Sequence, residues 1–441
     1  MNSTINSQAR LLFSLENSYK IERKTELEDM VNYSPRANAP IHNWFKYREG
    51  YSVDVIDNII SKEDRKILDP FCGCGSTLLS SKKNGVPAIG IDINPVPAFV
   101  SNVKTRNYSN ENLISINEAL KTIILSKSNS EIPVPNLSII NTAFHPEILH
   151  YLLKLKYRIN QISDTKIRDF VLLGFLSIIE SVSNTYKEGN GIKYRFTKRT
   201  KNGYIRIPLE KWYSENLPSD KCEFVKSRLT NKINSMISDI QRTNYPKTEI
   251  EVLKASSQNL SELVKRNSIT LCVFSPPYCN CFDYFEIFKL ELWLGEFVRS
   301  REELRNVRKQ SLRSNTNADL QRPVKEFSFL EDFLELVDAE NIWSKRILSV
   351  IRGYFTDMEA VLKGILESLT PGGRCVIIVG NSAYGGVLIP TDILLAKISE
   401  QLGFIVEKIT VARHLTTSSQ QKKQLQDVKG FLRESLVCLK K

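Results

Sequence analysis

Residues 66–94, KILDPFCGCGSTLLSSKKNGVPAIGIDIN, decide the fold of this chain. The apolar residues before Asp69 predict a strand, the glycines after it predict a turn, and Leu78 and Leu79 lie in a predicted helix. A second apolar run, which ends at Asp92, predicts another strand. A strand–helix–strand unit of about 30 residues indicates parallel strands and the beginning of a doubly wound α/β sheet.

The rest of the chain divides into segments of different character. Residues 1–40 are weakly patterned and are expected to form an N-terminal arm. Residues 41–109 and 250–441 carry further helix and strand patterns, whereas residues 110–249 are expected to form a mostly helical insertion. A second insertion is expected over residues 299–345. We therefore expect a Rossmann-like α/β domain with a large helical insertion and basic loops.

The net charge of +12 is concentrated in two segments. Residues 187–249 hold 14 Lys and Arg against 7 Asp and Glu, and residues 299–325 hold 8 against 3. The two surpluses equal the whole net charge, so the remainder of the chain is balanced. Local basicity favours a polyanionic partner, because each phosphate contact releases condensed counterions. A solvated basic surface without a partner is the alternative.

One basic stretch, KEGNGIKYRFTKRTKNGY at residues 187–204, interleaves aromatic and basic residues between glycines. We expect it to form a loop that contacts phosphates and enters a groove of a nucleic acid. The basic insertion at residues 299–325 is expected to complete the same clamp. The side chains expected to bind the nucleic acid are Lys193, Arg195, Lys198, Arg199 and Lys201.

The sequence disfavours a membrane protein, a secreted protein and a metalloprotein. It has no run of about 18 apolar residues, and its first residues lack the pattern of a secretory signal. A cytoplasmic location is therefore expected. The close cysteine pairs, Cys72/Cys74 and Cys279/Cys281, have the C-x-C spacing rather than the C-x-x-C spacing of zinc sites, so no metal site is predicted.

The turn after the first predicted strand is expected to bind a nucleoside. Glycine at positions 73 and 75 permits positive φ and close approach of a ligand to the backbone. The turn lacks the lysine of a P-loop and the longer dinucleotide fingerprint. Asp92, at the tip of the second strand, can accept both ribose hydroxyls, and Asp69 can hold an amino group. Because nothing here requires a phosphate, S-adenosylmethionine fits; for Asp92 alone, a helix N-cap is the alternative.

Ser275-Pro276-Pro277-Tyr278 follows the apolar strand predicted at residues 269–274. The prolines fix φ and remove N–H donors, so the backbone carbonyls project rigidly. An exocyclic amino group is a poor nucleophile until acceptors bind its N–H protons, and the Pro276 carbonyl and the Ser275 hydroxyl can do so. Tyr278 offers a face on which a flipped base can stack. These four residues are the candidate catalytic residues for direct in-line methyl transfer.

Together, DPFCGCGST, GIDINP and SPPY resemble the motifs of the amino-group DNA methyltransferases. The segment IHNWFKYREGYS, which begins at residue 41, is similar to the part of that family that packs beside the methionine part of the cofactor. The resemblance covers residues 41–108 and 250–441. It implies a methyltransferase sheet, S-adenosylmethionine as cofactor, double-stranded DNA as partner and flipping of the target base.

By that resemblance, Phe71, Gly73 and Gly75 would line the cofactor, and Asp92 would hold its ribose. The cofactor-binding residues implied are Trp44, Asp69, Phe71, Gly73, Gly75, Asp92, Ile93 and Ser256. Serine at the first position of SPPY is usual in cytosine-N4 enzymes, whereas Asp or Asn is usual in adenine-N6 enzymes. We therefore expect methylation of N4 of cytosine, with the bases read by the helical insertion.

Two features depart from the serine-type pattern. The cofactor turn precedes the catalytic motif, an order more common in certain adenine enzymes, and Ser256 stands where the family often has an acidic residue beside the adenine amine. The alternatives are an adenine-N6 DNA methyltransferase, an RNA guanine-N2 methyltransferase and a non-catalytic nucleic-acid-binding protein. The sequence leaves open the oligomeric state and whether a cognate restriction endonuclease is a partner.

Overall fold

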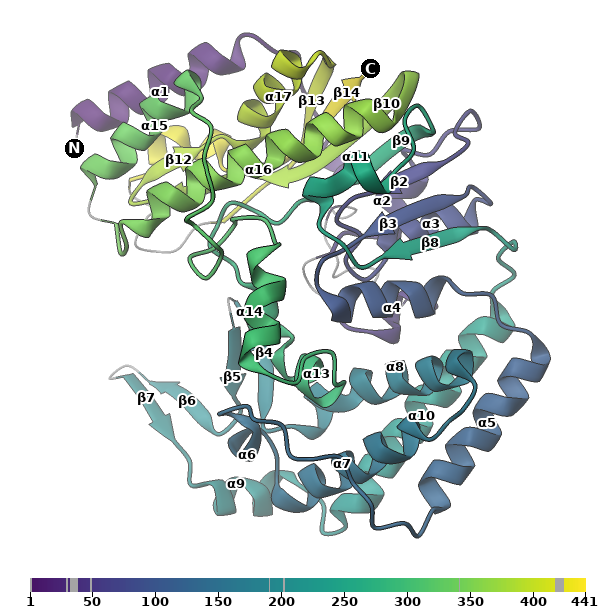
Figure 1. Cartoon of the computed structure of the whole chain (residues 1–441). Coiled ribbons are helices and arrows are strands. Elements are labelled where there is room, and N and C mark those ends of the chain that lie inside the picture. Colours follow the sequence, from purple (N-terminus) through teal and green to yellow (C-terminus); the bar gives the residue numbers. More distant parts are fainter. Residues whose placement is uncertain are drawn as a thin grey trace.

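Strand β2 (Ile67–Asp69) lies inside an eight-stranded sheet, between β3 (Ala88–Ile91) and β9 (Ile269–Phe274). The sheet has the order β1-β13-β14-β10-β9-β2-β3-β8 (Figure 1). The computed structural model describes residues 2–28, 31, 39–47, 50–189, 191–200, 203–340, 342–416 and 424–441.

Five neighbouring strands of this sheet are parallel, namely β8 (Ile250–Leu253), β3, β2, β9 and β10 (Leu369–Gly380). If these five strands are numbered by their order along the chain, they lie side by side in the order 3-2-1-4-5, as in a doubly wound sheet. Strand β14 (Arg433–Lys440) runs antiparallel between β10 and β13 (Ile405–His414). The Rossmann-like sheet expected from the sequence is therefore confirmed.

Both faces of the parallel strands are covered, which explains why β9 is apolar except at Thr270. Successive residues of β9 point to opposite faces: Cys272 and Phe274 belong to one hydrophobic core, and Leu271 and Val273 belong to another. The first core includes α15 (Ser328–Ala339), α16 (Arg346–Ser368) and α17 (Thr391–Leu402); the second includes α2 (Val53–Asp57) and part of α3 (Ser76–Lys83).

The described part of residues 1–40 is not a separate arm but an edge of the catalytic domain. Helix α1 (Asn2–Glu16) is held by Glu16, which accepts from the Arg433 guanidinium at 2.5 Å. Strand β1 (Ile21–Arg23) then extends the sheet by pairing in parallel with β13.

The insertion at residues 110–249 is mostly helical, as predicted, and forms the lower lobe in Figure 1. Its central helix, α8 (Thr165–Val182), packs against α10 so closely that a Cβ at Gly174 would lie 2.3 Å from the Ile233 side chain. The lobe shares one hydrophobic core with α4 (Pro95–Thr105) of the catalytic domain. Its other helices are α5 (Asn110–Leu125), α6 (Ile140–Ala143), α7 (Pro146–Asn160), α9 (Leu209–Asn216) and α10 (Lys221–Arg242).

The prediction of a loop at residues 187–204 is wrong, because this stretch forms most of two antiparallel β-hairpins. They are β4 (Thr185–Glu188) with β5 (Gly191–Tyr194), and β6 (Thr197–Thr200) with β7 (Gly203–Arg206). Gly189 and Gly203 adopt φ of 54° and 119°, which the turns require. Phe196 packs with Trp212 and Tyr213 in a small aromatic core that anchors the second hairpin.

The segment expected as a second insertion begins with α14 (Arg301–Lys309), which has no buried residue and lies between the two lobes in Figure 1. It ends in α15, which belongs to the layer that covers the sheet. After SPPY the chain forms two short helices, α12 (Tyr284–Ile287) and α13 (Lys289–Leu294), with Phe288 between them. The remaining elements include η3 (His42–Trp44), η4 (Ser257–Asn259), α11 (Leu260–Leu263), β11 (Ser382–Tyr384), β12 (Val387–Ile389) and η5 (Gln426–Phe431). Within the described ranges, no helix is long and apolar enough to cross a membrane.

Asp392 joins several elements around the beginning of β14 and should be important for stability. Its fully buried carboxylate accepts from Arg433 Nε at 2.8 Å, Ser435 Oγ at 2.9 Å and Asn381 Nδ2 at 2.9 Å. Asp392→Ala should lower the free energy of unfolding in urea by about 3–5 kcal/mol, because it leaves a buried guanidinium with less compensation. Asp338→Ala, which removes an exposed ion pair with Lys345, is the control and should change it by less than about 0.5 kcal/mol. Equal effects of both substitutions would contradict this assignment.

Candidate active site

The glycine turn and the SPPY motif meet at one cleft. Because β2 and β9 are adjacent and parallel, the loops that leave their carboxyl ends emerge side by side. A cleft of about 960 Å³, open to solvent, lies at this point. The predicted site residues that line it are Phe71, Gly73, Asp92, Ile93, Ser256, Ser275, Pro276 and Pro277.

The two glycines of the turn have different roles. Gly73 lines the cleft with φ of 49°, and a Cβ there would lie 3.1 Å from the Tyr47 ring. Gly75, with φ of 85°, does not line it; a Cβ at this position would lie 2.5 Å from Ser101 Oγ on α4. Gly73 therefore keeps the backbone open to a ligand, whereas Gly75 allows the start of α3 to approach α4.

Asp92 sits at the tip of β3 and is held by the backbone on both sides. Its Oδ2 accepts from the Gly73 N–H at 3.0 Å, and its Oδ1 accepts from the Asn94 N–H at 2.8 Å. Burial raises the pKa of this carboxyl to about 7, against the effect of the two N–H donors. The carboxylate is therefore fixed in direction at the cleft and titrates near neutral pH.

Asp69 does not line the cleft but lies behind it. Its carboxylate accepts from the Tyr51 hydroxyl at 3.1 Å and from the Phe71 N–H at 3.0 Å. Burial raises the pKa of Asp69 to about 6. Asp69 therefore stabilises the glycine turn from the protein interior. This differs from the prediction that its carboxylate holds an amino group of a ligand.

Trp44 does not line the cleft either. Its indole N–H donates to Asp239 at 3.0 Å, and its ring meets Phe170 edge-on at 5.4 Å, so it belongs to the core shared with the insertion. Tyr47, three residues later, lines the cleft instead and stacks on Phe288 at 5.5 Å. The sequence could not separate the two, because the segment is aromatic throughout.

The residues around Asp92 fit an adenosine-type ligand. A carboxylate is available for ribose hydroxyls, and Phe71 and Ile93 offer apolar surface for a base. The Asn94 side-chain Nδ2 is buried in the cleft wall without a hydrogen-bond partner among the described residues, which is unfavourable.

Tyr278 is the one member of the SPPY motif that does not line the cleft. Its hydroxyl donates to Glu434. Burial and the Glu434 charge hold the pKa of Tyr278 well above its ordinary value, so the hydroxyl remains a neutral donor. The ring is thus anchored by its hydroxyl, while Ser275, Pro276 and Pro277 line the cleft.

The sequence did not predict the wall of the cleft opposite the glycine turn. Gln310, Ser311, Leu312, Ser314 and Asn315 line it, although the segment was expected to bind nucleic acid. The Ser256 hydroxyl, from the predicted cofactor set, donates to the Gln310 carbonyl at 2.8 Å and connects this wall to the sheet.

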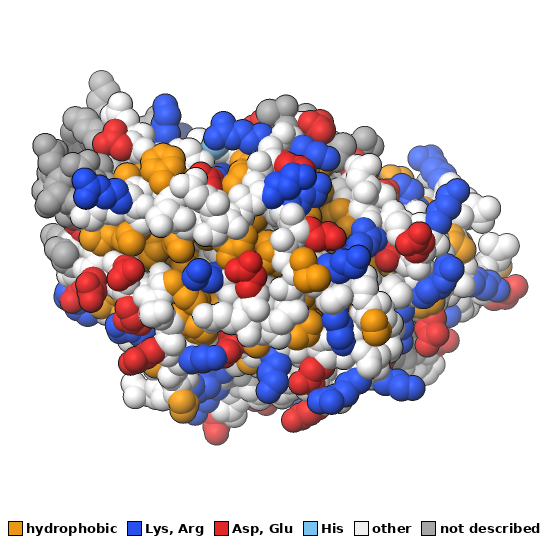
Figure 2. Space-filling view, turned by 90° about the horizontal axis from the view of Figure 1, so that it is seen from above, with side chains coloured by type: hydrophobic (Ala, Val, Ile, Leu, Met, Phe, Trp, Pro, Cys, Tyr) orange, Lys and Arg blue, Asp and Glu red, His pale blue; other side chains and the backbone are white. Residues whose placement is uncertain are grey.

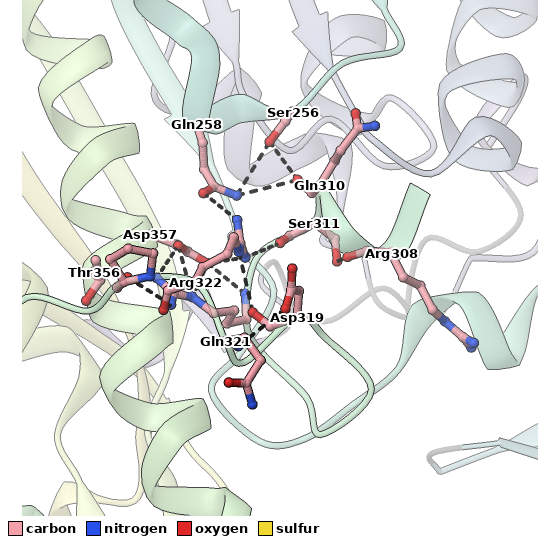
Figure 3. Close-up of polar contacts among 12 residues, drawn as sticks. Ser256, Gln258, Arg308, Gln310, Ser311, Asp319, Gln321, Arg322, Thr356 and Asp357 are labelled. Atoms are coloured by element: carbon pink, nitrogen blue, oxygen red, sulfur yellow. Dashed lines mark hydrogen bonds and ion pairs between the residues drawn. The ribbon is translucent and has the colours of Figure 1, made fainter. Parts of the chain in front are cut away.

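This wall is fixed by buried arginine–aspartate pairs. The Arg313 guanidinium is buried and donates to Asp357 on α16 at 2.8 Å and 3.2 Å. Figure 3 shows Arg322 reaching the same carboxylate at 3.1 Å and Gln258 at 3.0 Å. Arg308 donates to acidic residues after the SPPY motif. These three basic residues of 299–325 are therefore paired within the protein, which corrects the expectation that the whole segment faces a polyanion.

Lys193 lies in β5, Lys198 lies in β6, and Arg195 lies between the two hairpins. Lys193, Arg195 and Lys198 are exposed. Arg199 lies in β6, and Lys201 is outside the described residues. By contrast, the face of the catalytic domain turned away from the insertion carries basic and acidic side chains side by side (Figure 2). Because Lys193, Arg195 and Lys198 are exposed, the hairpin region presents a basic surface beside the domain that contains the cleft.

Comparisons with known proteins agree with this geometry. No family model matches the chain. It is 30% identical over 443 residues to the type II methyltransferase M.BsoBI of Geobacillus stearothermophilus, covering 91% of this chain and 86% of the relative. It is 26% identical to M.AvaI of Nostoc sp. strain PCC 7120 over 87% of this chain and 83% of that relative. It is also 26% identical to M.MvaI of Kocuria varians, over 77% and 75%.

These similarities extend over nearly the whole chain, including both motifs at the cleft and the insertion between them. They confirm the family expected from the motifs: this chain belongs to the type II DNA methyltransferases.

Proposed function

We propose that this protein transfers a methyl group from S-adenosylmethionine to the exocyclic N4 amino group of cytosine in duplex DNA. The observation that carries the proposal is that Asp92 and Ser275-Pro276 line the same cleft. The Asp92 carboxylate suits the ribose of a nucleoside, and the Ser275 hydroxyl and Pro276 carbonyl suit an amino group. A direct transfer between them requires only that both be held in line.

The cofactor would be held by Asp92, Asn94, Phe71 and Ile93, with Gly73 leaving the backbone accessible. S-adenosylmethionine, when bound, supplies an activated methyl group on a sulfonium. Asp92 would accept the ribose hydroxyls with a carboxylate that two backbone N–H groups already orient. The buried Asn94 amide would find the acceptor that it lacks.

The amine would be held by the Ser275 hydroxyl and the Pro276 carbonyl, each accepting from one N–H of the target base. Removing electron density from the N–H bonds makes the nitrogen lone pair more available. A covalent enzyme intermediate is not needed. The Cys279 thiol does not line the cleft, and burial raises its pKa, so it is not a nucleophile here.

Cytosine is favoured over adenine by serine at the first position of the motif. Since the relatives are type II methyltransferases, we further propose that a restriction endonuclease with the same recognition sequence accompanies this protein.

The two hairpins would bind the DNA beside the cleft. A two-stranded ribbon is narrow enough for the major groove, and β7 is exposed along its whole length. Tyr204 and Ile205 are 69% and 58% exposed, an unusual state for large apolar side chains on a well-anchored strand. Lys193, Arg195 and Lys198 would contact phosphates.

Nucleoside analysis tests the proposed reaction. The protein is incubated with S-adenosylmethionine and DNA amplified in vitro, which has no modified bases, and the digested DNA is analysed by mass spectrometry. We expect N4-methylcytosine. N6-methyladenine would overturn the choice of base, and methylation of transfer RNA but not DNA would overturn the choice of substrate.

Cofactor affinity should depend on pH through Asp92. The carboxylate accepts both ribose hydroxyls, and its pKa in the free protein is about 7. Affinity should therefore be full well above this pH and fall, by up to about tenfold per pH unit, as the pH drops below it. Calorimetric titration with S-adenosylhomocysteine at several pH values measures the effect.

Asp92→Asn is the matched variant for this titration. It should bind weakly at every pH and lose the pH dependence. The same slope in Asp92→Asn as in the wild type would assign the titration to another group, such as Asp69.

The hairpin residues should determine how DNA binding depends on salt. Replacing Lys193, Arg195 and Lys198 with alanine should weaken binding and reduce the slope of log K against log salt by about 0.9 for each phosphate that the protein no longer neutralises. Fluorescence anisotropy with a labelled duplex at several salt concentrations measures the slope.

Alanine replacements of Lys20, Lys345 and Lys440, which are exposed on the catalytic domain, remove the same charge and serve as control. They should leave the slope nearly unchanged. Equal slopes for the two triple variants would show that the hairpins have no special part in binding.

A further inference from the structure

A row of residues crosses three neighbouring strands beside the catalytic motif. Glu434 on β14 is the register partner of Gly380 on β10 and of Arg413 on β13. Gly380 is at the carboxyl end of the strand that follows β9 in the sheet. The row therefore lies next to the loop that begins with Ser275.

The Tyr278 ring lies along this row. A Cβ at Gly380 would be 2.8 Å from Cε2 and 3.2 Å from Cδ2 of the ring, so the absence of a side chain there makes room for it. The Tyr278 hydroxyl reaches past Gly380 and donates to Glu434 Oε1. Arg413 Nε donates to the other carboxylate oxygen, Oε2, at 2.5 Å.

Glu434 is only 3% exposed, and burying a carboxylate is unfavourable unless it gains partners of this kind. Tyr278 does not line the cleft, so its hydroxyl does not contact the target amine. The hydrogen bond between the Tyr278 hydroxyl and the buried Glu434 carboxylate therefore has another role than direct contact with the reacting groups.

We propose that Glu434 is a positioning residue for methyl transfer: it fixes the Tyr278 ring through its hydroxyl and, with it, the end of the Ser275–Tyr278 segment whose Ser275 and Pro276 hold the target amine. Arg413 keeps the carboxylate in place from the other side. The proposal rests on the proposed function, because it concerns the same transfer.

A double-mutant cycle tests it with Glu434→Gln, Tyr278→Phe and the combined variant. Glutamine retains the size of the side chain, so folding should be preserved. We measure kcat for methyl transfer to in vitro amplified DNA, affinity for S-adenosylhomocysteine, and the melting temperature. Glu434→Gln should lower kcat by between about tenfold and a hundredfold, as expected for small misplacements of reacting groups, with unchanged cofactor affinity. Since Glu434 acts through the hydroxyl, the combined variant should be no slower than Tyr278→Phe alone.

Asp64→Asn is the matched control. Asp64 is equally buried and pairs with Arg374 at 2.7 Å, but it precedes β2, at the opposite end of the strands. It should lower the melting temperature without changing kcat, alone or combined with Tyr278→Phe.

The proposal would be overturned if Glu434→Gln left kcat unchanged or weakened cofactor binding. It would also be overturned if Glu434→Gln lowered kcat by the same factor in the wild type and in Tyr278→Phe. Absence of transfer to DNA by the wild-type protein is a different result, which would overturn the proposed function itself.

Discussion

The position of β2 between β3 and β9 is the constraint from which the site follows. All three strands are parallel, so the glycine turn, Asp92 and Ser275 emerge at one edge of the sheet although 183 residues separate the last two. From β2 the chain builds β3 and β8 on one side and then crosses to build β9 and β10 on the other, so a crevice opens where the strand order reverses. Were β9 placed elsewhere in the sheet, the amine-binding backbone and the nucleoside-binding carboxylate could not share a cleft.

Two further constraints keep the cleft in shape. The helical lobe shares a continuous hydrophobic core with α4, which begins three residues after Asp92, so the lobe and the cofactor strand are packed as one unit. The wall at residues 310–315 is attached to α16 through Asp357, which two arginines contact. Rigid attachment of this kind suits a reaction in which the protein contributes position rather than covalent chemistry.

The elements that the sequence predicted well are those with local signals. An apolar run before a glycine turn indicated β2, a second run indicated β3, and an apolar strand before two prolines indicated β9, so the order of motifs predicted the sheet and most of the cleft. Asp92, Gly73 and Ser275 to Pro277 line the cleft, and their roles in it stay predictions. The near full-length similarity to type II methyltransferases confirmed the family.

The elements that it did not predict depend on contacts between distant residues. Arg313 and Asp357 are 44 residues apart, and nothing in the basic segment distinguishes a buried arginine from an exposed one. The hairpins were mistaken for a loop because their cross-strand pairing follows no strong apolar alternation. Trp44 and Tyr47 could be told apart only by packing, since Asp239, which holds the indole, comes from α10.

Calorimetric titration of S-adenosylhomocysteine into the protein, without DNA, tests whether this cleft is a preformed cofactor site. One saturable site per chain is the predicted result, because the groups that would bind the nucleoside are already ordered around Asp92. Absence of saturable binding, or binding that Asp92→Asn leaves unchanged, would contradict the assignment of the cleft.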